Sequence, residues 1–227
     1  MKKALSIWSG ILLVVLLMAG CKSMNKTQKG AVIGTAGGAV AGAVIGEIAG
    51  NAQLGALIGA AVGGVTGAII GRKMDKQAEE IKNKIPDAKV ERVGEGIVIE
   101  FNDKILFGFD ESRLSADARV SLGKLVTVLK EYPDTNIEIQ GHTDEKGSIK
   151  YNQALSVRRA DAVSSYLYQS GLASSRLTVK GFGESSPKYT STTKEGNAQN
   201  RRVEFLVSAN EKMKADAARE AAKESNN

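Results

Sequence analysis

The chain has 227 residues, of which 42% are hydrophobic and 25% are charged, a balance that is ordinary for a folded protein. Its formal net charge is +6, but no basic stripe interleaved with aromatic residues is present, so nucleic acid is not an expected partner. One cysteine and one histidine exclude an internal disulfide and argue against a structural zinc site, which needs four such ligands. We expect neither a metal nor another cofactor.

Residues 1–20 have the pattern of an export signal. Lys2 and Lys3 precede the apolar run Ile11 to Met18, which is too short to span a membrane comfortably. The run ends in "LMAGC", which resembles the lipobox of bacterial lipoproteins, where the cysteine is alkylated with diacylglycerol and the signal is removed before it. The resemblance implies lipidation of Cys21, with an acyl chain such as palmitate on its new amine. The alternative is an ordinary signal peptide with an unrelated cysteine.

Residues 21–29 are predicted to be a short linker behind this anchor. Each acyl chain contributes about 0.8 kcal/mol per buried CH₂, so two or more chains hold a protein stably at a membrane. Lys22, and not an aspartate, follows Cys21. By analogy with the enterobacterial sorting rule, this favours the outer membrane.

Between residues 30 and 71, glycine recurs at every fourth position, with one interruption at "GNAQLG". Glycine in a helix costs about 1 kcal/mol relative to alanine, so close packing of helices must offset this stripe. The pattern predicts an antiparallel helical hairpin whose arms approach the ~20 residues that cross a bilayer. It resembles the glycine-zipper segment of several bacterial envelope lipoproteins.

Three arrangements of this hairpin remain open. The first is a hairpin inserted into a membrane, and the second is a contact with a membrane surface or with other copies of the chain. The third is a hairpin that packs on itself in water. Glu47 near the turn and Arg72 and Lys73 after the second arm favour membrane association, because they lie where water or headgroups would be. Contact with other copies would make a homo-oligomer through the glycine zipper.

The remainder alternates between strand and helix patterns. Residues 72–92 are predicted to be a charged helical linker, 93–209 the folded domain, and 210–227 a polar tail. Within the domain, "GIVIEF", "NIEIQG", "RLTVKGFG" and "RRVEFLV" predict strands, and apolar residues at helical spacing lie between them. The order β-α-β-α-β-(α)-β predicts an α+β helix-on-sheet sandwich.

One pair of charges in this domain needs an explanation. At 100° per residue, Arg159 falls near the middle of the helix face that carries Leu155, together with Asn152, whereas Arg158 points to the side. A cation aimed at the core needs a partner, and Asp144 follows the preceding strand. The pair is interpreted either as a closed salt bridge or as a ligand site.

"FGFD", "GHTDEKG", "YNQALSVRRADAV", "GFGESSP" and "AQNRRVE", in this order, resemble the OmpA-like peptidoglycan-binding family over about Gly96 to Ser208. Together with the signal, the cysteine and the glycine ladder, they are similar to outer-membrane lipoproteins of the YiaD type. The resemblance implies an OmpA-like β-α-β-α-β-type sandwich preceded by a glycine-zipper helical hairpin. It also implies that this domain holds the stem peptide of peptidoglycan without covalent chemistry.

The resemblance further implies which residues bind. Asp144 would receive the ammonium group of meso-diaminopimelate, and Arg159 would bind a carboxylate of the same residue. Arginine suits this role because it offers two parallel N–H donors, which lysine does not. Asn152, Asp110 and Arg202 are implied to line the same pocket.

The sequence therefore predicts a tether, with a lipid anchor in the outer membrane at one end and peptidoglycan held by a periplasmic domain at the other. The alternative is a structural or membrane-perturbing glycine-zipper protein in which wall binding is secondary. An enzyme is not expected, because His142 beside Asp144 has no serine or cysteine nucleophile in the required context.

Overall fold

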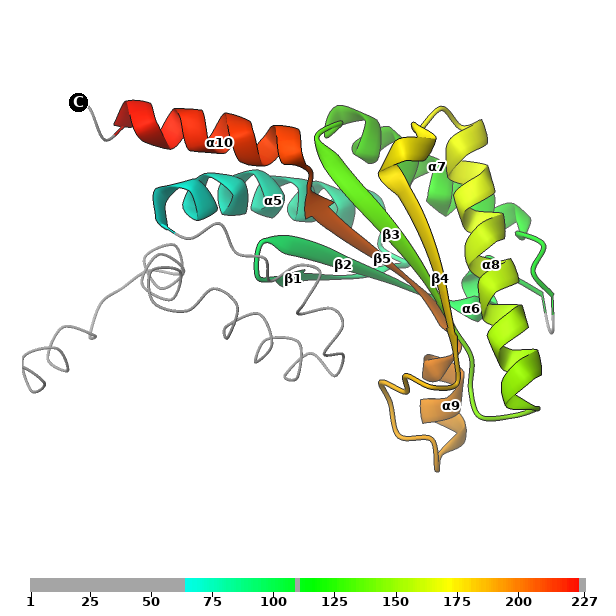
Figure 1. Cartoon of the computed structure of the whole chain (residues 1–227). Helices are drawn as coiled ribbons and strands as arrows, with labels where there is room; N and C mark the ends of the chain where they lie inside the picture. Colours follow the sequence, from blue (N-terminus) through cyan, green and yellow to red (C-terminus); the bar gives the residue numbers. More distant parts are fainter. Residues whose placement is uncertain (1–63, 109–110, 225–227) are drawn as a thin grey trace, which may run out of the picture.

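The computed structural model describes residues 64–108 and 111–224, which form a five-stranded sheet with helices packed on one face (Figure 1). The helices are α5 (Gly64–Lys84), α6 (Asp103–Leu106), α7 (Ala116–Glu131), α8 (Ile149–Gln169), α9 (Lys194–Asn200) and α10 (Glu211–Glu224), with a 3-10 turn η1 (Ser174–Arg176). The strands are β1 (Lys89–Val93), β2 (Gly96–Asn102), β3 (Thr135–His142), β4 (Leu177–Gly183) and β5 (Arg202–Ala209).

The strand order is β1-β2-β5-β3-β4, in which β3 and β4 are parallel and the other neighbours are antiparallel. A parallel pair needs a long crossover, and α8 supplies it between β3 and β4. The predicted α+β helix-on-sheet sandwich is confirmed. The structure adds β1, a strand that the sequence pattern did not predict.

The core lies between the helices and one face of the sheet. Alternate residues of each strand point to this face, since successive side chains of a strand point to opposite sides. Phe101 of β2 and Phe205 of β5 meet there edge to face, with ring centroids 5.6 Å apart. Apolar residues of α5, α7, α8 and α10 complete the same cluster, among them Ile70, Leu125 and Val163.

Helix α8 packs against β3 and β4 (Figure 1). The close approach requires glycine at two facing strand positions. A Cβ at Gly141 would overlap the carbonyl oxygen of Ser156, and a Cβ at Gly181 would overlap the side chain of Val157. The two glycines therefore set the height of α8 above the sheet, and with it the position of Arg159.

The structure differs from the expectation of a linker over 72–92. The segment belongs to α5 and β1, and α5 buries Ile70, Met74 and Ile81 completely. These residues recur at helical spacing on one face, while the charged residues occupy the opposite face. The helical character of the segment was predicted, but its high charge concealed an apolar face that makes the helix part of the core.

The expected polar tail over 210–227 also differs in the structure. Most of it is α10, which packs along α5 and buries Met213 and Ala217 (Figure 1). The side chain of Asn210 accepts a hydrogen bond from the Met213 amide at 2.9 Å and caps the start of this helix.

The predicted anchor, including Cys21, lies outside the described residues, as do residues 30–63 of the predicted glycine-zipper hairpin. Residues 64–71 of that segment form the first turns of α5. None of the helices in the described part of the chain combines the length and the apolar character that a membrane crossing requires.

Truncation of Ile70 tests whether α5 belongs to the cooperative fold. We expect Ile70→Ala to lower the free energy of unfolding by about 2–5 kcal/mol, because it leaves a cavity in the core. Val65→Ala, on the same helix at a side chain that is 50% exposed, is the control and should change it by less than about 0.5 kcal/mol. Urea unfolding followed by circular dichroism measures both. Equal midpoints for Ile70→Ala and the wild type would show that α5 is dispensable.

The second prediction concerns Gly141. An added methyl group would meet backbone, which has no other rotamer to adopt, so Gly141→Ala should destabilise the chain by about 1–3 kcal/mol or more. Gly123→Ala in α7 is the matched control, because its Cβ would meet the Tyr166 hydroxyl at an ordinary 3.4 Å. There the gain in helix propensity should stabilise by up to about 1 kcal/mol. A neutral effect of Gly141→Ala in the same unfolding assay would refute the close approach of α8.

Candidate binding site at one edge of the sheet

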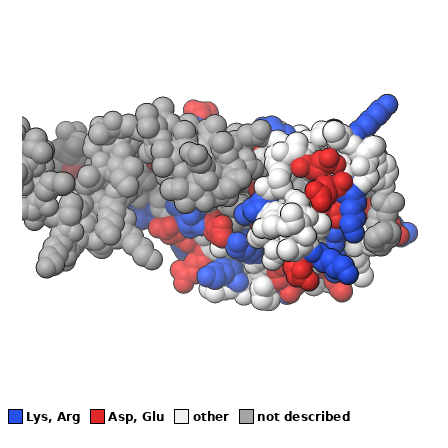
Figure 2. Space-filling model, turned by 90° about the horizontal axis from the view of Figure 1, so that it is seen from below, with Lys and Arg blue, Asp and Glu red and all other residues white. Residues whose placement is uncertain are grey.

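Four charged side chains gather where β2, β3 and β4 end and β5 begins. We call this set the ionic cluster; it consists of Asp103, Asp144, Arg159 and Arg201. Strand ends and the loops beyond them commonly carry functional residues, because a rigid scaffold holds them while they stay accessible. Seen from below, this end of the molecule shows acidic and basic side chains next to one another rather than in separate fields (Figure 2).

The strand register brings the cluster together. Asn102 of β2 pairs with Arg202 of β5, and the next residue out, Asp103, donates its amide to the carbonyl of Arg201 at 2.9 Å. On the other side of β5, His142 of β3 also pairs with Arg202, so the loop that carries Asp144 leaves the sheet beside Arg201. Three strand ends therefore converge on one small volume.

The charges of the cluster alternate in sign. The Arg159 guanidinium lies 3.4 Å from Asp103 Oδ2, and Arg201 Nε lies 3.4 Å from the same oxygen. Arg201 Nη1 then lies 2.6 Å from Asp144 Oδ2. The carboxylate closest to Arg159 among these contacts is thus Asp103, and Asp144 pairs with Arg201. The closed Asp144–Arg159 salt bridge, which was one of the two interpretations of the sequence, is replaced among the described residues by a chain of three ion pairs.

Arg159 points inward, as the helical spacing predicted, and Arg158 beside it is exposed. Arg159 is only 3% exposed. Its Nε donates to the carbonyl of Glu111 at 3.0 Å, and its guanidinium carbon lies 5.2 Å from the centre of the Phe107 ring. A cation buried this far is stabilised by such hydrogen bonds and by the electron-rich ring face, in addition to its carboxylate.

Asp144 is 6% exposed and sits in a tight loop between β3 and α8. Its Oδ1 accepts from the Lys146 amide at 3.2 Å, while its backbone carbonyl accepts from Asn152 Nδ2 at 3.3 Å. Asn152 also donates to Glu184 Oε2 at 2.5 Å. The structure therefore brings Asn152 to Asp144, where it fixes the loop from the first turns of α8.

Asp103 is a member of the cluster that the sequence reasoning missed. Burial raises the pKa of its carboxyl above the usual 3.8, and the charges of Arg159 and Arg201 oppose that rise. Its second oxygen, Oδ1, is buried and has no hydrogen-bond partner. An acceptor left in this state costs free energy, which a donor arriving from a ligand would recover.

Arg202 does not join the cluster. Its guanidinium donates to Glu204 Oε1 at 2.6 Å and to the carbonyl of Asn200, on the face of the sheet that lies opposite the helices. The arginine that contacts Asp144 and Asp103 is its neighbour Arg201. Asp110, the remaining residue of the predicted pocket, lies outside the described residues.

Strand periodicity contains the signal that separates the two arginines. Val203, Phe205 and Val207 point to the helix-covered face, so Arg201 shares their side of the strand and Arg202 does not. By the same count, Asp103 follows Phe101 on the helix-covered side of β2. The two-residue periodicity of the strands could therefore have identified both Asp103 and Arg201 from the sequence.

His142 also lies on the face opposite the helices. It is 1% exposed, and its ring stacks on Phe182 with centroids 5.2 Å apart and planes 9° apart. Neither ring nitrogen has a hydrogen-bond partner. Burial, followed by the charges of Arg202 and Lys188, lowers the pKa of His142 well below the usual 6.5. Within the described residues, no group of three or more His, Cys, Asp or Glu side chains is placed to hold a metal ion.

Comparison with family models places the site in a known context. The model described as the OmpA family matches residues 106–201, and the model described as YMGG-like Gly-zipper matches residues 1–75. The fold is similar to that of the cell wall anchor of the T6SS from Pseudomonas aeruginosa, with a TM-score of 0.53 and 26% sequence identity, covering 60% of this chain and 96% of that one.

Two lipoproteins are similar in sequence. The outer-membrane lipoprotein YfiB of Pseudomonas aeruginosa is 36% identical over 115 residues, which cover 51% of this chain and 68% of that protein. The probable lipoprotein YiaD of Escherichia coli is 35% identical over 137 residues, which cover 60% of this chain and 63% of that protein. For most of the curated relatives, the chain covers less than two thirds of the relative's length, and for one relative it covers only 16%.

The burial of His142 predicts a pH dependence of stability. The unfolded chain binds a proton at this residue below about pH 6.5, while the folded chain does not, so the free energy of unfolding should fall as pH decreases from 6.5 toward 5. One such proton contributes at most about 1.4 kcal/mol per pH unit. His142→Phe keeps a ring against Phe182 and should remove this contribution. Urea unfolding at several pH values measures it, and parallel pH profiles for the two chains would contradict the assignment.

Proposed function

The chain belongs to the OmpA family, and we propose that its ionic cluster binds peptidoglycan non-covalently through the diaminopimelate end of the stem peptide. The observation that carries the proposal is the alternation of two aspartates and two arginines at one edge of the sheet. Fold and family membership support the general class of function. The chemistry of the cluster supports the particular ligand.

The free end of diaminopimelate is a zwitterion, with an ammonium group and a carboxylate on one carbon atom. Its recognition needs a carboxylate acceptor and a forked donor a few ångströms apart. Asp144 would accept from the ammonium group, and Arg159 would donate to the carboxylate. Both are already held in place by other contacts, which limits the entropy lost on binding.

Arg201 is the member of the cluster that would move. Its side chain is 26% exposed, whereas those of Asp103 and Asp144 are nearly buried. We propose that the ligand ammonium takes the place of the Arg201 guanidinium at Asp144, and that Arg201 turns toward the ligand carboxylate. Asp103 would remain as the counter-ion of both arginines, and its unpartnered Oδ1 offers a second acceptor.

The proposed role is a tether in the bacterial envelope. Lipidation of Cys21 would anchor the chain in the outer membrane, with the described domain in the periplasm. The names of the relatives, an outer-membrane lipoprotein and a cell wall anchor, support this arrangement.

Each charged hydrogen bond contributes only about 1.5–3 kcal/mol net, so the affinity of one domain should be modest. Many copies on one polymer would still hold firmly through multivalency. The role requires binding alone and no catalysis.

Sedimentation with insoluble peptidoglycan tests the proposal on the full chain in a mild detergent. Asp144→Asn and Arg159→Gln should each weaken the affinity for peptidoglycan by at least about tenfold, since each removes a charged hydrogen bond. The fraction of protein that pellets should fall accordingly. The matched controls are Asp161→Asn and Arg158→Gln, which change the same charges at exposed positions of α8. They should pellet like the wild type. Circular dichroism on all variants separates loss of binding from loss of fold.

A comparison of two chemical types of peptidoglycan tests whether the diaminopimelate zwitterion is the group recognised. Diaminopimelate-type peptidoglycan should pellet the chain, and lysine-type peptidoglycan, which lacks the second carboxylate, should pellet much less. Equal pelleting by both types would mean that the zwitterion is not recognised. Failure of the wild type to pellet with either one would refute wall binding.

A further inference from the structure

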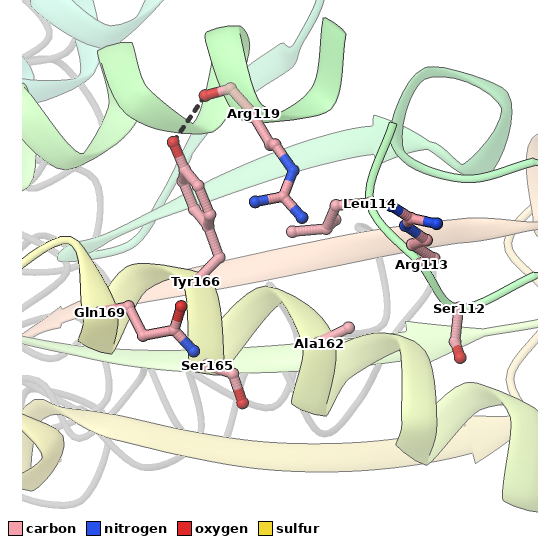
Figure 3. Close-up of a pocket in the computed structure, with 8 residues that line it drawn as sticks. All are labelled: Ser112, Arg113, Leu114, Arg119, Ala162, Ser165, Tyr166 and Gln169. Atoms are coloured by element: carbon pink, nitrogen blue, oxygen red, sulfur yellow. Dashed lines mark hydrogen bonds between the residues drawn. The ribbon is translucent and has the colours of Figure 1, made fainter. Parts of the chain in front are cut away.

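A second polar pocket lies between the loop before α7 and the outer side of α8 (Figure 3). Its volume is about 180 Å³, well above the roughly 10–15 Å³ that one water-sized group needs. The lining residues are Ser112, Arg113, Leu114, Arg119, Ala162, Ser165, Tyr166 and Gln169. None of them belongs to the ionic cluster.

The charge of this pocket is one-sided. Arg113 and Arg119 line it, and none of the described residues in the lining is acidic. Among the described ion pairs, neither guanidinium has a carboxylate within 4.0 Å, in contrast to both arginines of the ionic cluster. Ser112, Ser165 and Gln169 add neutral hydrogen-bond donors. Donors without a resident acceptor are suited to a group that brings negative charge.

Arg119 is held by contacts that leave its guanidinium available. The Tyr166 hydroxyl donates to the Arg119 carbonyl at 2.8 Å, which ties α8 to the first turns of α7 (Figure 3). The Arg119 guanidinium carbon lies 5.8 Å from the centre of the Tyr166 ring. The first turn of a helix favours negative charge, so a cation there gains from an anion that binds beside it. The pocket thus presents an oriented cation at the positive end of a helix.

The pocket adjoins the proposed wall site. Ser112 follows Glu111, whose carbonyl accepts from Arg159. Ala162 and Gln169, the first and last lining residues of α8, are displaced from Arg159 by about 5–15 Å along the helix axis, at ~1.5 Å per residue. An extended peptide covers this distance with about two to four residues. A stem peptide held at the ionic cluster could therefore reach the pocket with its neighbouring groups.

We propose that this pocket is a subsite for a second carboxylate of the bound stem peptide, the α-carboxylate of the γ-linked glutamate next to diaminopimelate. The inference rests on the proposed function, because the ionic cluster must hold the diaminopimelate. Arg119 and Arg113 supply the charge, and the hydroxyl groups of Ser112 and Ser165 supply directed donors. The prediction that follows is selectivity for wall polymer in which this carboxylate is free over polymer in which it is amidated.

The test is residue-resolved NMR on the full ¹⁵N-labelled chain in detergent micelles. The probes are a soluble diaminopimelate muropeptide with the glutamate carboxylate free, the same muropeptide with it amidated, and inorganic phosphate at constant ionic strength. The wild type is compared with Arg119→Gln and with the control Arg158→Gln. Backbone amides of Ser112, Ser165 and Gln169 report on the pocket, and those of Thr143 and Asp144 report on the ionic cluster.

We expect the free-acid muropeptide to shift both sets of signals in the wild type and in Arg158→Gln. Amidation should weaken binding by about tenfold in these two chains and by clearly less in Arg119→Gln, which lacks one of the two charges that recognise the carboxylate. That pattern supports the subsite.

Three results would overturn the subsite, and a fourth would overturn the proposed function on which it rests. Signals that shift at the cluster but not at the pocket refute the subsite and leave the proposed function standing. Equal affinity of the wild type for both muropeptides refutes the assigned carboxylate. A pocket that responds to phosphate but to neither muropeptide is a site for a free anion and not for the wall. Cluster signals that stay unmoved with every muropeptide refute the proposed function itself.

Discussion

The site depends on one electrostatic constraint: two aspartates and Arg159 are buried together at the edge of the sheet, with the partly exposed Arg201 beside them. A buried charge without a partner is costly, so each member of the cluster needs the others to be placed correctly. The chain meets this requirement by backbone register, because the hydrogen bond from Asp103 to the carbonyl of Arg201 continues the β2–β5 ladder by one step. Asp144 reaches the same place from the end of β3. The ion pairs therefore follow from the sheet and do not rely on flexible loops alone.

The position of Arg159 follows from packing on the other side of the cluster. Glycine at two strand positions lets α8 descend onto β3 and β4 until its backbone touches the sheet. At that height the inward arginine reaches Asp103 and the carbonyl of Glu111. A larger residue in either strand would lift the helix and move Arg159 away from its partners. Glycines that have no side chain to offer the ligand thus control the geometry of the charge that would bind it.

The sequence predicted the elements whose patterns are regular. The four apolar strands, the long helix after Asp144 and the inward direction of Arg159 all follow from periods of two and 3.6 residues. What it did not predict lies in charge-rich segments. Residues 72–92 were predicted as a helical linker and 210–227 as a polar tail, whereas α5 and α10 each bury a narrow apolar face in the core. Strand β1, with the sequence Lys-Val-Glu-Arg-Val, was not predicted. The charge-rich composition hid the burial of α5 and α10, although the spacing of their apolar residues would have revealed it.

The same contrast holds for the site. Asp144, Asn152 and Arg159 were found from a helical face and a family resemblance, and the structure brings these three together. Asp103 and Arg201 were missed, because only the pairing of β2 with β5 makes them neighbours. A single sequence does not show which strands pair. It does show on which side of its strand each residue lies. The sequence thus supplied the ligand-binding hypothesis, and the fold supplied the counter-ions.

The most direct test of this account is a crystal structure of the chain with a diaminopimelate-containing muropeptide bound. The account predicts the ligand ammonium within hydrogen-bonding distance of Asp144, the ligand carboxylate on Arg159, and Arg201 displaced from Asp144 toward the ligand. A bound muropeptide that leaves the Asp144–Arg201 pair intact and contacts neither Asp144 nor Arg159 would contradict it. In that case the four charges would be a structural fastening of the sheet edge, and wall binding would belong to another surface.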